Sequence, residues 1–539
     1  MNQRRLARIA VLVFLTSLVR WPNTVVSEET IIPSRDAITI STGPITGETR
    51  DGVRIFRGIP YAAPPVGERR WKEAVPPEPW TKPRACVKYG PSCPQPANKL
   101  VGDVGEQSED CLYLNVWTAA KGSEVGAHGR APLPVMVWIH GGGFYMGSGA
   151  QAVFDGTPLA KHGVVLVTIN YRVGPFGFLV HPLLTAESPN KASGNYGLMD
   201  QIFALKWVQQ NIAQFGGDPN NVTIFGESAG AVSVCVLMTS PLAKGFFHRA
   251  IAESGAAPGR IKFRRGAKAP LQSAESSGVA FAKRLGVEDT PDALKALRAK
   301  APQELLNGAS SISSLAGAGT LEYLIVDGYV LPGPPAKVLA EGRQINVPVL
   351  IGTNADEGTV FARRAGVDTL EEYNAFLQKT FRGLSDKVLK YYPANDDASA
   401  QRAFIDFMGD GFVYGARSMA RRMAAIQLKT YLYQFTRATP WAQEAGLGCF
   451  HGSEIPYVFG NLREGRYGED DRRLSDQVVG YWTRFARTGD PNGEGAATWP
   501  AYDASADQHL ILDAPIKVGQ NLRKQTCDWL DALQRRRQQ

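Results

Sequence analysis

The sequence Val222-Thr223-Ile224-Phe225-Gly226-Glu227-Ser228-Ala229-Gly230 predicts a strand that ends in a sharp turn. The small and apolar residues 231–237 that follow favour a helix. Glycines flank the central serine because such a turn crowds the strand against the helix and leaves no room for side chains. Ser228 would then lie at the tip of the turn, at a helix N-terminus that favours developing negative charge, so it is a candidate nucleophile.

Strand-like and helix-like segments alternate around this turn. Residues 135–139 and 164–169 are continuous apolar runs, as expected of strands that are buried on both faces. Apolar residues recur at helical spacing in residues 198–212. This alternation predicts an α/β fold with a central, mostly parallel sheet flanked by helices.

Other segments extend this pattern at both ends of the chain. Residues 37–40 and 53–56 alternate around turns that contain glycine and aspartate, and they predict a small N-terminal antiparallel sheet. Residues 430–435 predict a further strand, and residues 368–428 read as helical insertions over the site.

The composition is that of an ordinary globular protein, with 44% hydrophobic and 20% charged residues. No repeat or low-complexity linker divides the chain, so we expect a single domain over residues 28–539. The net charge of +8 comes without a basic run that is interleaved with aromatic residues, which argues against nucleic-acid binding. The excess charge could attract an anionic substrate. We expect no cofactor and no metal.

The N-terminus predicts export. Basic residues precede the apolar run of residues 9–19, which is too short to span a bilayer and typical of a signal peptide. We expect a signal peptide over residues 1–27, a mature start at Glu28 and a secreted or periplasmic protein. No other segment is long and apolar enough to cross a membrane. Export permits disulfides, but the spacing of the six cysteines does not give their pairing.

A glycine-rich stretch, His140-Gly141-Gly142-Gly143-Phe144, directly follows the apolar run of residues 135–139. Without Cβ atoms, its backbone can approach a substrate oxygen closely. The N–H groups of Gly142 and Gly143, together with that of Ala229, are therefore candidates for an oxyanion hole. We expect His140 to support this loop.

A serine nucleophile needs a base and a group that orients the base. In folds with this turn the base follows the acid near the C-terminus, which leaves His451 and His509 among seven histidines. We select His451, because it lies in a loop shortly after the predicted strand at 430–435. Asp356 and Glu357 both follow the apolar residues 347–351, and position alone does not choose between them as the acid.

Taken together, these motifs resemble the type B carboxylesterase family over about residues 36–530. The resemblance implies an α/β-hydrolase fold and hydrolysis of carboxylic esters through an acyl-enzyme. The stretches that carry it are Phe56-Arg57-Gly58-Ile59-Pro60-Tyr61-Ala62, Ser108-Glu109-Asp110-Cys111-Leu112-Tyr113-Leu114-Asn115, the triple-glycine loop, Asn170-Tyr171-Arg172, Gly226-Glu227-Ser228-Ala229-Gly230, Asp356-Glu357-Gly358 and His451-Gly452-Ser453-Glu454.

The resemblance also implies particular residue roles. It makes Glu357 the acid, so that the triad is Ser228, Glu357 and His451. Glu227 and Ser254 match positions near the catalytic histidine. Further implied pairings are a Cys93–Cys111 disulfide and the ion pairs Arg57–Glu109 and Arg172–Asp200. The resemblance assigns no partner to Cys86, Cys449 or Cys527.

The substrate class is less closely indicated, and the oligomeric state is not indicated at all. Residues 94–110 contain no aromatic side chain that could bind a choline cation, as cholinesterases of this family do. Basic residues after Ser254 suggest polycarboxylate (tricarballylate-type) esters: Arg260, Lys262, Arg264 and Arg265. The alternatives are a general short-acyl or aryl esterase and, in another class, an inactive adhesion or binding protein. Inactive members usually lack the nucleophile, whereas all three triad residues are present here.

Overall fold

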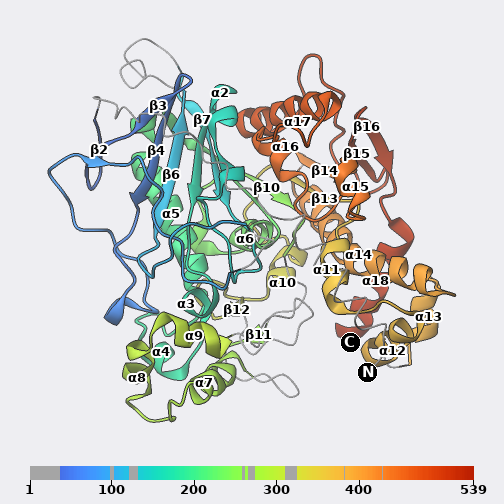
Figure 1. Cartoon of the computed structure of the whole chain (residues 1–539), viewed down its shortest axis with the longest axis horizontal. Helices are drawn as coiled ribbons and strands as arrows, with labels where there is room; N and C mark the ends of the chain where they lie inside the picture. The colour runs from blue at the N-terminus through green and yellow to red at the C-terminus, as the bar shows by residue number, and fades with distance from the viewer. Residues whose placement is uncertain are drawn as a thin grey trace.

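The computed structural model describes residues 37–97, 102–119, 131–257, 262–264, 273–309, 324–381, 383–427 and 429–538. Its central feature is an 11-stranded sheet with the order β16-β15-β14-β13-β10-β9-β7-β8-β6-β4-β3 (Figure 1). The strands from β8 to β15 in this order pair in parallel. They are β8 (Val165–Ile169), β7 (Leu133–Ile139), β9 (Gly217–Glu227), β10 (Arg249–Glu253), β13 (Val349–Asn354), β14 (Thr430–Phe435) and β15 (Gln508–Leu512). The predicted α/β-hydrolase fold is thus confirmed.

Antiparallel strands complete both edges of this sheet. They are β6 (Tyr113–Thr118), β4 (Val53–Pro60) and β3 (Glu48–Arg50) on one side and β16 (Lys517–Gln520) on the other. Residues 53–56, predicted as an antiparallel strand, lie in β4 of the large sheet rather than in the small one, and β4 pairs antiparallel with β3 and β6. Alternating apolar residues indicate a half-buried strand but not its partner. The small N-terminal sheet consists of β1 (Ile38–Ile40), β2 (Gly43–Thr46) and β5 (Arg84–Ala85), with β1 antiparallel and β5 parallel to β2.

Both faces of the sheet are buried, and alternate residues of one strand contribute to the two cores. In β7, Val135, Val137 and Ile139 pack in the core that includes α5 (Tyr196–Asn211) and α6 (Ala229–Leu237). Met136 and Trp138 pack on the opposite face, in the core that includes α16 (Ile455–Phe459) and α17 (Glu469–Thr488). The strand therefore reads as a continuous apolar run because neither face meets water.

A third core joins the helical insertion to the C-terminal helix (Figure 1). The insertion contains α12 (Leu370–Phe381), α13 (Ser385–Leu389) and α14 (Asp397–Ala424). Trp529 and Leu533 of α18 (Lys524–Gln538) pack against it. The insertion is therefore not an isolated lid, because the end of the chain holds it in place.

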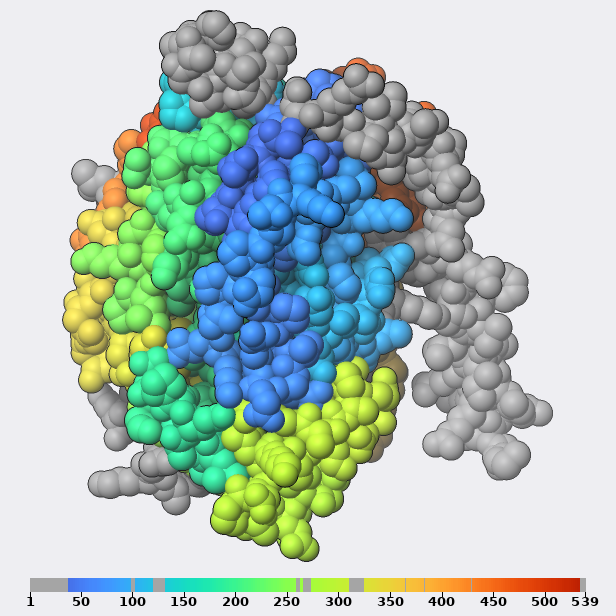
Figure 2. Space-filling model, turned by 90° about the vertical axis from the view of Figure 1, so that its left-hand side faces the viewer, coloured from blue at the N-terminus to red at the C-terminus, as the bar shows by residue number. Residues whose placement is uncertain are grey.

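Three further helices, α7 (Ala274–Arg284), α8 (Ala293–Ala299) and α9 (Pro302–Ala309), contribute Phe281, Leu297 and Leu305 to the first of these cores. Figure 2 shows that these helices, in yellow-green, project below the N-terminal residues on one face. The remaining elements are α2 (Thr157–Lys161), α3 (Gly174–Phe178), α4 (Pro182–Glu187), α10 (Pro335–Ala340), α11 (Thr359–Ala365), α15 (Pro440–Glu444), β11 (Lys262–Phe263), β12 (Ile325–Val326) and the short 3-10 helices Gly67–Arg69, Ala152–Phe154, Ile212–Phe215 and Pro241–Ala243.

The two implied ion pairs have different outcomes. Arg172 and Asp200 are buried and form the predicted pair, with Nη2 and Oδ1 2.7 Å apart. The Arg57–Glu109 pair is wrong, because Arg57 binds Glu48 and Glu109 binds Arg70. Glu48 lies opposite Ile55 on the neighbouring strand, which makes Arg57 its diagonal neighbour on the same face.

In the described part of the chain, the helices are all too short or too polar to cross a membrane. The predicted signal peptide, residues 1–27, lies outside the described residues.

Candidate active site

Ser228 occupies the turn between β9 and α6 in a strained backbone conformation, with φ 55° and ψ −119°. Its N–H donates to the carbonyl oxygen of Glu253 at 2.8 Å. A Cβ atom on Gly226 would lie 2.5 Å from the carbonyl oxygen of Ile139, and one on Gly230 would collide with the same oxygen. Both glycines are therefore required because the end of β7 passes directly beside the turn.

The glycine-rich loop that follows β7 passes next to the serine. A Cβ atom on Gly141 would lie 2.7 Å from Glu227 Oε2 and 3.2 Å from Ser228 Cβ. Gly142 and Gly143 have φ values of 100° and 65°, which favour glycine. Within the described residues, the N–H groups of these two glycines donate to no protein acceptor. They are thus available to a ligand oxygen, as an oxyanion hole requires.

His140 supports this loop, as predicted. Its Nδ1 atom lies 2.9 Å from the carbonyl oxygen of Gly141, and its ring stacks on Tyr171 with centroids 4.4 Å apart. The Tyr171 hydroxyl donates to the carbonyl oxygen of His140 at 2.9 Å. Burial lowers the pKa of His140 to about 4, so the ring stays neutral at ordinary pH.

The structure brings His451 and Glu357 together. His451 Nδ1 lies 2.5 Å from Glu357 Oε2, and the other oxygen of this buried carboxylate accepts a hydrogen bond from the Asn354 N–H at 2.7 Å. Asp356 turns away, toward Arg402 and the N–H of Cys449. Of the two carboxylates that position alone left open, it is therefore Glu357, the one that the resemblance implied, that contacts the imidazole.

The other ring nitrogen of His451 faces a different glutamate. His451 Nε2 lies 3.1 Å from Glu227 Oε1. No hydrogen bond between Ser228 and His451 is present in the described part of the chain. Catalytic hydrogen bonds often form only when substrate binds, and Glu227 directly precedes Ser228. The imidazole thus contacts the side chain of the residue that precedes the serine, without a hydrogen bond to the serine itself.

Two more buried glutamates, Glu253 and Glu454, which the sequence analysis did not single out, lie near Glu227. Trp482 Nε1 donates to Glu253 Oε1 at 2.8 Å. Glu454 accepts hydrogen bonds from Asn354 and, at 3.4 Å, from the buried hydroxyl of Ser254. Glu253 was recognisable as the end of the strand next to β9, where side chains of parallel strands converge.

These carboxylates set the charge of the site. Burial raises the pKa of Glu227 to about 7 and that of Glu454 to about 8. Burial alone would lower the pKa of His451, but Glu227 and Glu357 outweigh it and raise the pKa to about 9. The site therefore stabilises a protonated imidazole.

Aromatic side chains from the helical insertion and from α11 flank the histidine. The rings of Phe361 and Phe412 lie 4.9 and 4.8 Å from the His451 ring, measured between centroids. Phe412 belongs to α14, so the predicted helical insertion does reach the site. This side of the imidazole is apolar.

The cysteines of the described chain are all buried and free. A hydrogen bond to Cys93, together with burial, raises the pKa of Cys111 well above its ordinary value, so the two thiols are in contact. Their disulfide stays a prediction. Cys449, close to His451, has its thiol 2.9 Å from the carbonyl oxygen of Phe435.

The basic residues proposed for substrate binding are only partly described. Arg264 pairs with Glu275, with Nη1 and Oε1 3.2 Å apart, and Lys262 lies in β11. Arg260 and Arg265 lie outside the described residues. Arg264 is therefore already engaged by a carboxylate of its own chain.

Comparison with known proteins agrees with this fold and site. Residues 34–530 match the model of the carboxylesterase family. The chain belongs to this family, type B, and is a serine carboxylesterase, a carboxylic ester hydrolase. The hypothesis of an inactive adhesion or binding protein is therefore set aside.

Individual relatives are similar over most of their length. Fumonisin B1 esterase from Sphingopyxis macrogoltabida is 40% identical over 86% of this chain and 84% of the relative. Para-nitrobenzyl esterase from Bacillus subtilis (strain 168) is 37% identical over 89% of this chain and 95% of the relative. A solved structure of a PNB esterase superposes with a TM-score of 0.76 at 36% identity, covering 91% of this chain and 98% of that chain.

The contact between Glu227 and His451 predicts a measurable shift. Glu227→Gln removes a carboxylate whose negative charge raises the pKa of His451. The pKa of His451, about 9 in the parent protein, should therefore be lower in this variant. A base with a lower pKa stays neutral at lower pH, so the acidic limb of the kcat/KM profile should move to lower pH. NMR titration of labelled histidine, with the His451 signal assigned from a His451→Gln variant, measures the pKa directly.

The matched control is Glu275→Gln, which neutralises another buried glutamate that pairs with Arg264 instead. It should leave the His451 titration unchanged. An unchanged His451 pKa in Glu227→Gln would contradict the assigned electrostatics.

Proposed function

We propose that this carboxylesterase forms an acyl-enzyme on Ser228, with His451 as general base and Glu357 as the acid that orients it. The observation that carries this proposal is the strained Ser228 turn beside the glycine loop, with the His451–Glu357 pair next to it. These are the nucleophile, the oxyanion donors and the oriented base that acyl transfer needs.

The mechanism follows from these positions. His451 Nε2 accepts the proton of the Ser228 hydroxyl while the oxygen attacks the ester carbonyl carbon. The N–H groups of Gly142, Gly143 and Ala229 bind the oxyanion of the tetrahedral intermediate. The imidazolium then protonates the leaving alcohol, and water releases the acid in a second round of the same steps.

Charge development explains the surrounding carboxylates. His451 becomes a cation in each tetrahedral intermediate, and Glu357 lies 2.5 Å from its Nδ1 atom. Glu227, 3.1 Å from Nε2, stabilises the same cation, and Ser254 acts further out by its hydrogen bond to Glu454. Glu227 and Ser254 are therefore positioning residues that do not contact the ester.

Ser228→Ala should reduce kcat by at least about 10³-fold, because no other hydroxyl occupies the turn. The fold should be kept, since alanine adds no atoms. Turnover of a para-nitrophenyl ester, and mass-spectrometric detection of an organophosphate adduct on Ser228 in the parent protein, measure both parts.

Ser233→Ala is the matched control, because Ser233 is a buried serine on the same helix, α6. It should keep turnover near that of the parent. Substantial esterase activity in Ser228→Ala, or an adduct on another residue, would refute the assignment.

For the substrate, we propose esters whose acyl group carries additional carboxylates. The 40% identity to a protein named fumonisin B1 esterase supports this. Removal of residues 1–27, which hold four arginines and no acidic residue, lowers the net charge from +8 to +4, so the mature chain is still basic. Arg264 is held by Glu275, so this residue does not add support. A neutral short-acyl or aryl ester is the second candidate, which the apolar rings of Phe361 and Phe412 beside His451 favour.

An ester panel separates these candidates. If the acyl group is anionic, kcat/KM should be higher for tricarballylate esters than for neutral esters of the same alcohol. This preference should decrease as salt is raised, because salt screens the attraction. If tricarballylate and neutral esters have equal kcat/KM values at every salt concentration, the neutral aryl or short-acyl ester is the substrate class.

We also propose that residues 1–27 direct export to the periplasm or beyond, leaving a single mature domain of residues 28–539 with a Cys93–Cys111 disulfide. The thiol contact between these two cysteines supports the pairing. The intact mass of protein recovered from the producing cells should correspond to a chain that starts at Glu28 and has lost two hydrogens. A full-length, fully reduced cellular protein would contradict this.

A further inference from the structure

Two loops meet at the contact between Glu357 and His451. The first follows β13, and the second lies between α15 and α16. Backbone and side-chain hydrogen bonds join them beyond the catalytic contact. Asn354 Nδ2 donates to the carbonyl oxygen of Phe450 at 2.8 Å, and Thr359 Oγ1 donates to that of Leu447 at 3.0 Å.

Asp356 joins the same loops twice. Its N–H donates to the carbonyl oxygen of Cys449 at 2.9 Å, and its Oδ2 atom accepts the N–H of Cys449 at 3.0 Å. Asp356 directly precedes Glu357, and Cys449 lies two residues before His451. The two hydrogen bonds therefore fix the backbones that carry the acid and the base relative to each other.

Gly448 shows how closely the second loop approaches this carboxylate. Its φ is 62°, and a Cβ atom there would collide with Asp356 Oδ2. Only glycine at position 448 therefore leaves room for the loop to pack against the Asp356 carboxylate.

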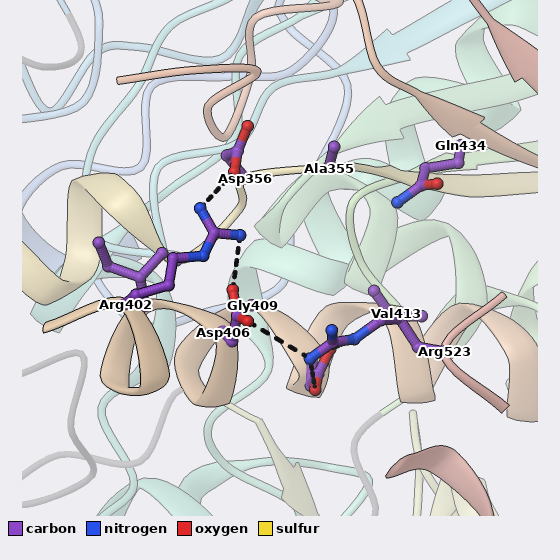
Figure 3. A pocket seen from close by; sticks show the side chains of 11 residues that line it. Ala355, Asp356, Arg402, Asp406, Gly409, Val413, Gln434 and Arg523 are labelled. Atoms are coloured by element: carbon purple, nitrogen blue, oxygen red, sulfur yellow. Dashed lines mark hydrogen bonds and ion pairs between the residues drawn. The ribbon is translucent and has the colours of Figure 1, made fainter. Parts of the chain in front are cut away.

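Arg402 holds the other oxygen of the carboxylate (Figure 3). Its Nη1 atom lies 3.2 Å from Asp356 Oδ1, and its Nη2 atom lies 2.6 Å from Asp406 Oδ1. Arg523, just before α18, continues the chain of charges to Asp406 at 3.8 Å and to Asp410 at 2.6 Å. A chain of ion pairs therefore runs from the C-terminal segment through α14 to Asp356, the residue next to the catalytic acid.

We propose that Asp356, oriented by Arg402, is a positioning residue that clamps the His451 loop to the Glu357 loop. This role rests on the proposed function. Asp356 contacts neither the imidazole nor the nucleophile, so it acts through the backbone of the two loops.

A positioning role differs from a stabilising one in what it changes. The Arg402 side chain is 59% exposed, and ion pairs at exposed positions contribute little to stability. Misplacement of a catalytic group by about 1 Å can reduce the rate by about 10²-fold. Loss of the clamp should therefore lower kcat while KM stays nearly constant, and loss of the Arg402 pair alone should leave the melting temperature nearly unchanged.

Asp356→Ala removes the acceptor for Cys449 and the partner of Arg402. We expect kcat for a para-nitrophenyl ester to fall by about 10- to 100-fold, with KM within about 2-fold of the parent value. Asp356→Asn keeps an oxygen that can accept the Cys449 N–H, so it should recover most of kcat. Organophosphate labelling of Ser228 fixes the concentration of active sites in each variant.

Arg402→Gln tests the second half of the proposal. It should lower kcat by about 3-fold in the parent protein and have no further effect in Asp356→Ala, because coupled residues are not additive. The matched control is Arg421→Gln. Arg421 lies on the same helix, α14, and pairs with Asp531 of α18 at 3.3 Å, but it does not touch Asp356. It should leave kcat unchanged.

Parent-like kcat in Asp356→Ala, a change confined to KM, or an Asp356→Asn variant as slow as Asp356→Ala would overturn the clamp. If Asp356→Ala does not fold, Arg402→Gln and Asp356→Asn decide: parent-like kcat in Arg402→Gln overturns the role of the guanidinium. None of these outcomes affects the assignment of Ser228, which is judged by Ser228→Ala and by covalent labelling.

Discussion

The approach of the Ile139 carbonyl to Gly226 and Gly230 is the constraint on which the rest of the site depends. Because no side chain fits between the end of β7 and the turn after β9, the turn can be sharp and Ser228 can take its strained conformation. The same approach carries the glycine loop, which follows β7 directly, past the serine. One backbone contact in the middle of the sheet thus places both the nucleophile and the oxyanion donors.

Charge is arranged around this rigid centre by burial. Glu227, Glu357 and Glu454 all raise the pKa of His451, and burial raises the pKa of Glu227 and of Glu454. The carboxylates repel one another and attract the imidazolium, so the site is most stable electrostatically when the histidine is charged. That is also the state of His451 in the tetrahedral intermediates, so the ground-state structure already contains the field that the reaction needs.

Much of the fold and of the site was predictable because its signals are local. Burial is indicated by the apolar runs at 135–139 and 430–435. Close backbone approach is indicated by the glycines around Ser228. Other features were not predictable, because they depend on which segments become neighbours. Arg57 pairs with Glu48 through the register of β3 and β4, and the order of the strands places the buried Glu253 beside Glu227.

The sequence by itself determined the fold class, the candidate nucleophile, the glycine loop and the candidate base, because each requires particular residue types at a fixed spacing. Position in the sequence did not choose between Asp356 and Glu357, and the family resemblance implied Glu357. The tertiary structure gives the physical reason, since both follow the same strand and only the position of the second loop shows which carboxylate meets His451. It also decided that Asp356 faces Arg402, because α14 reaches the acid loop only through long-range packing.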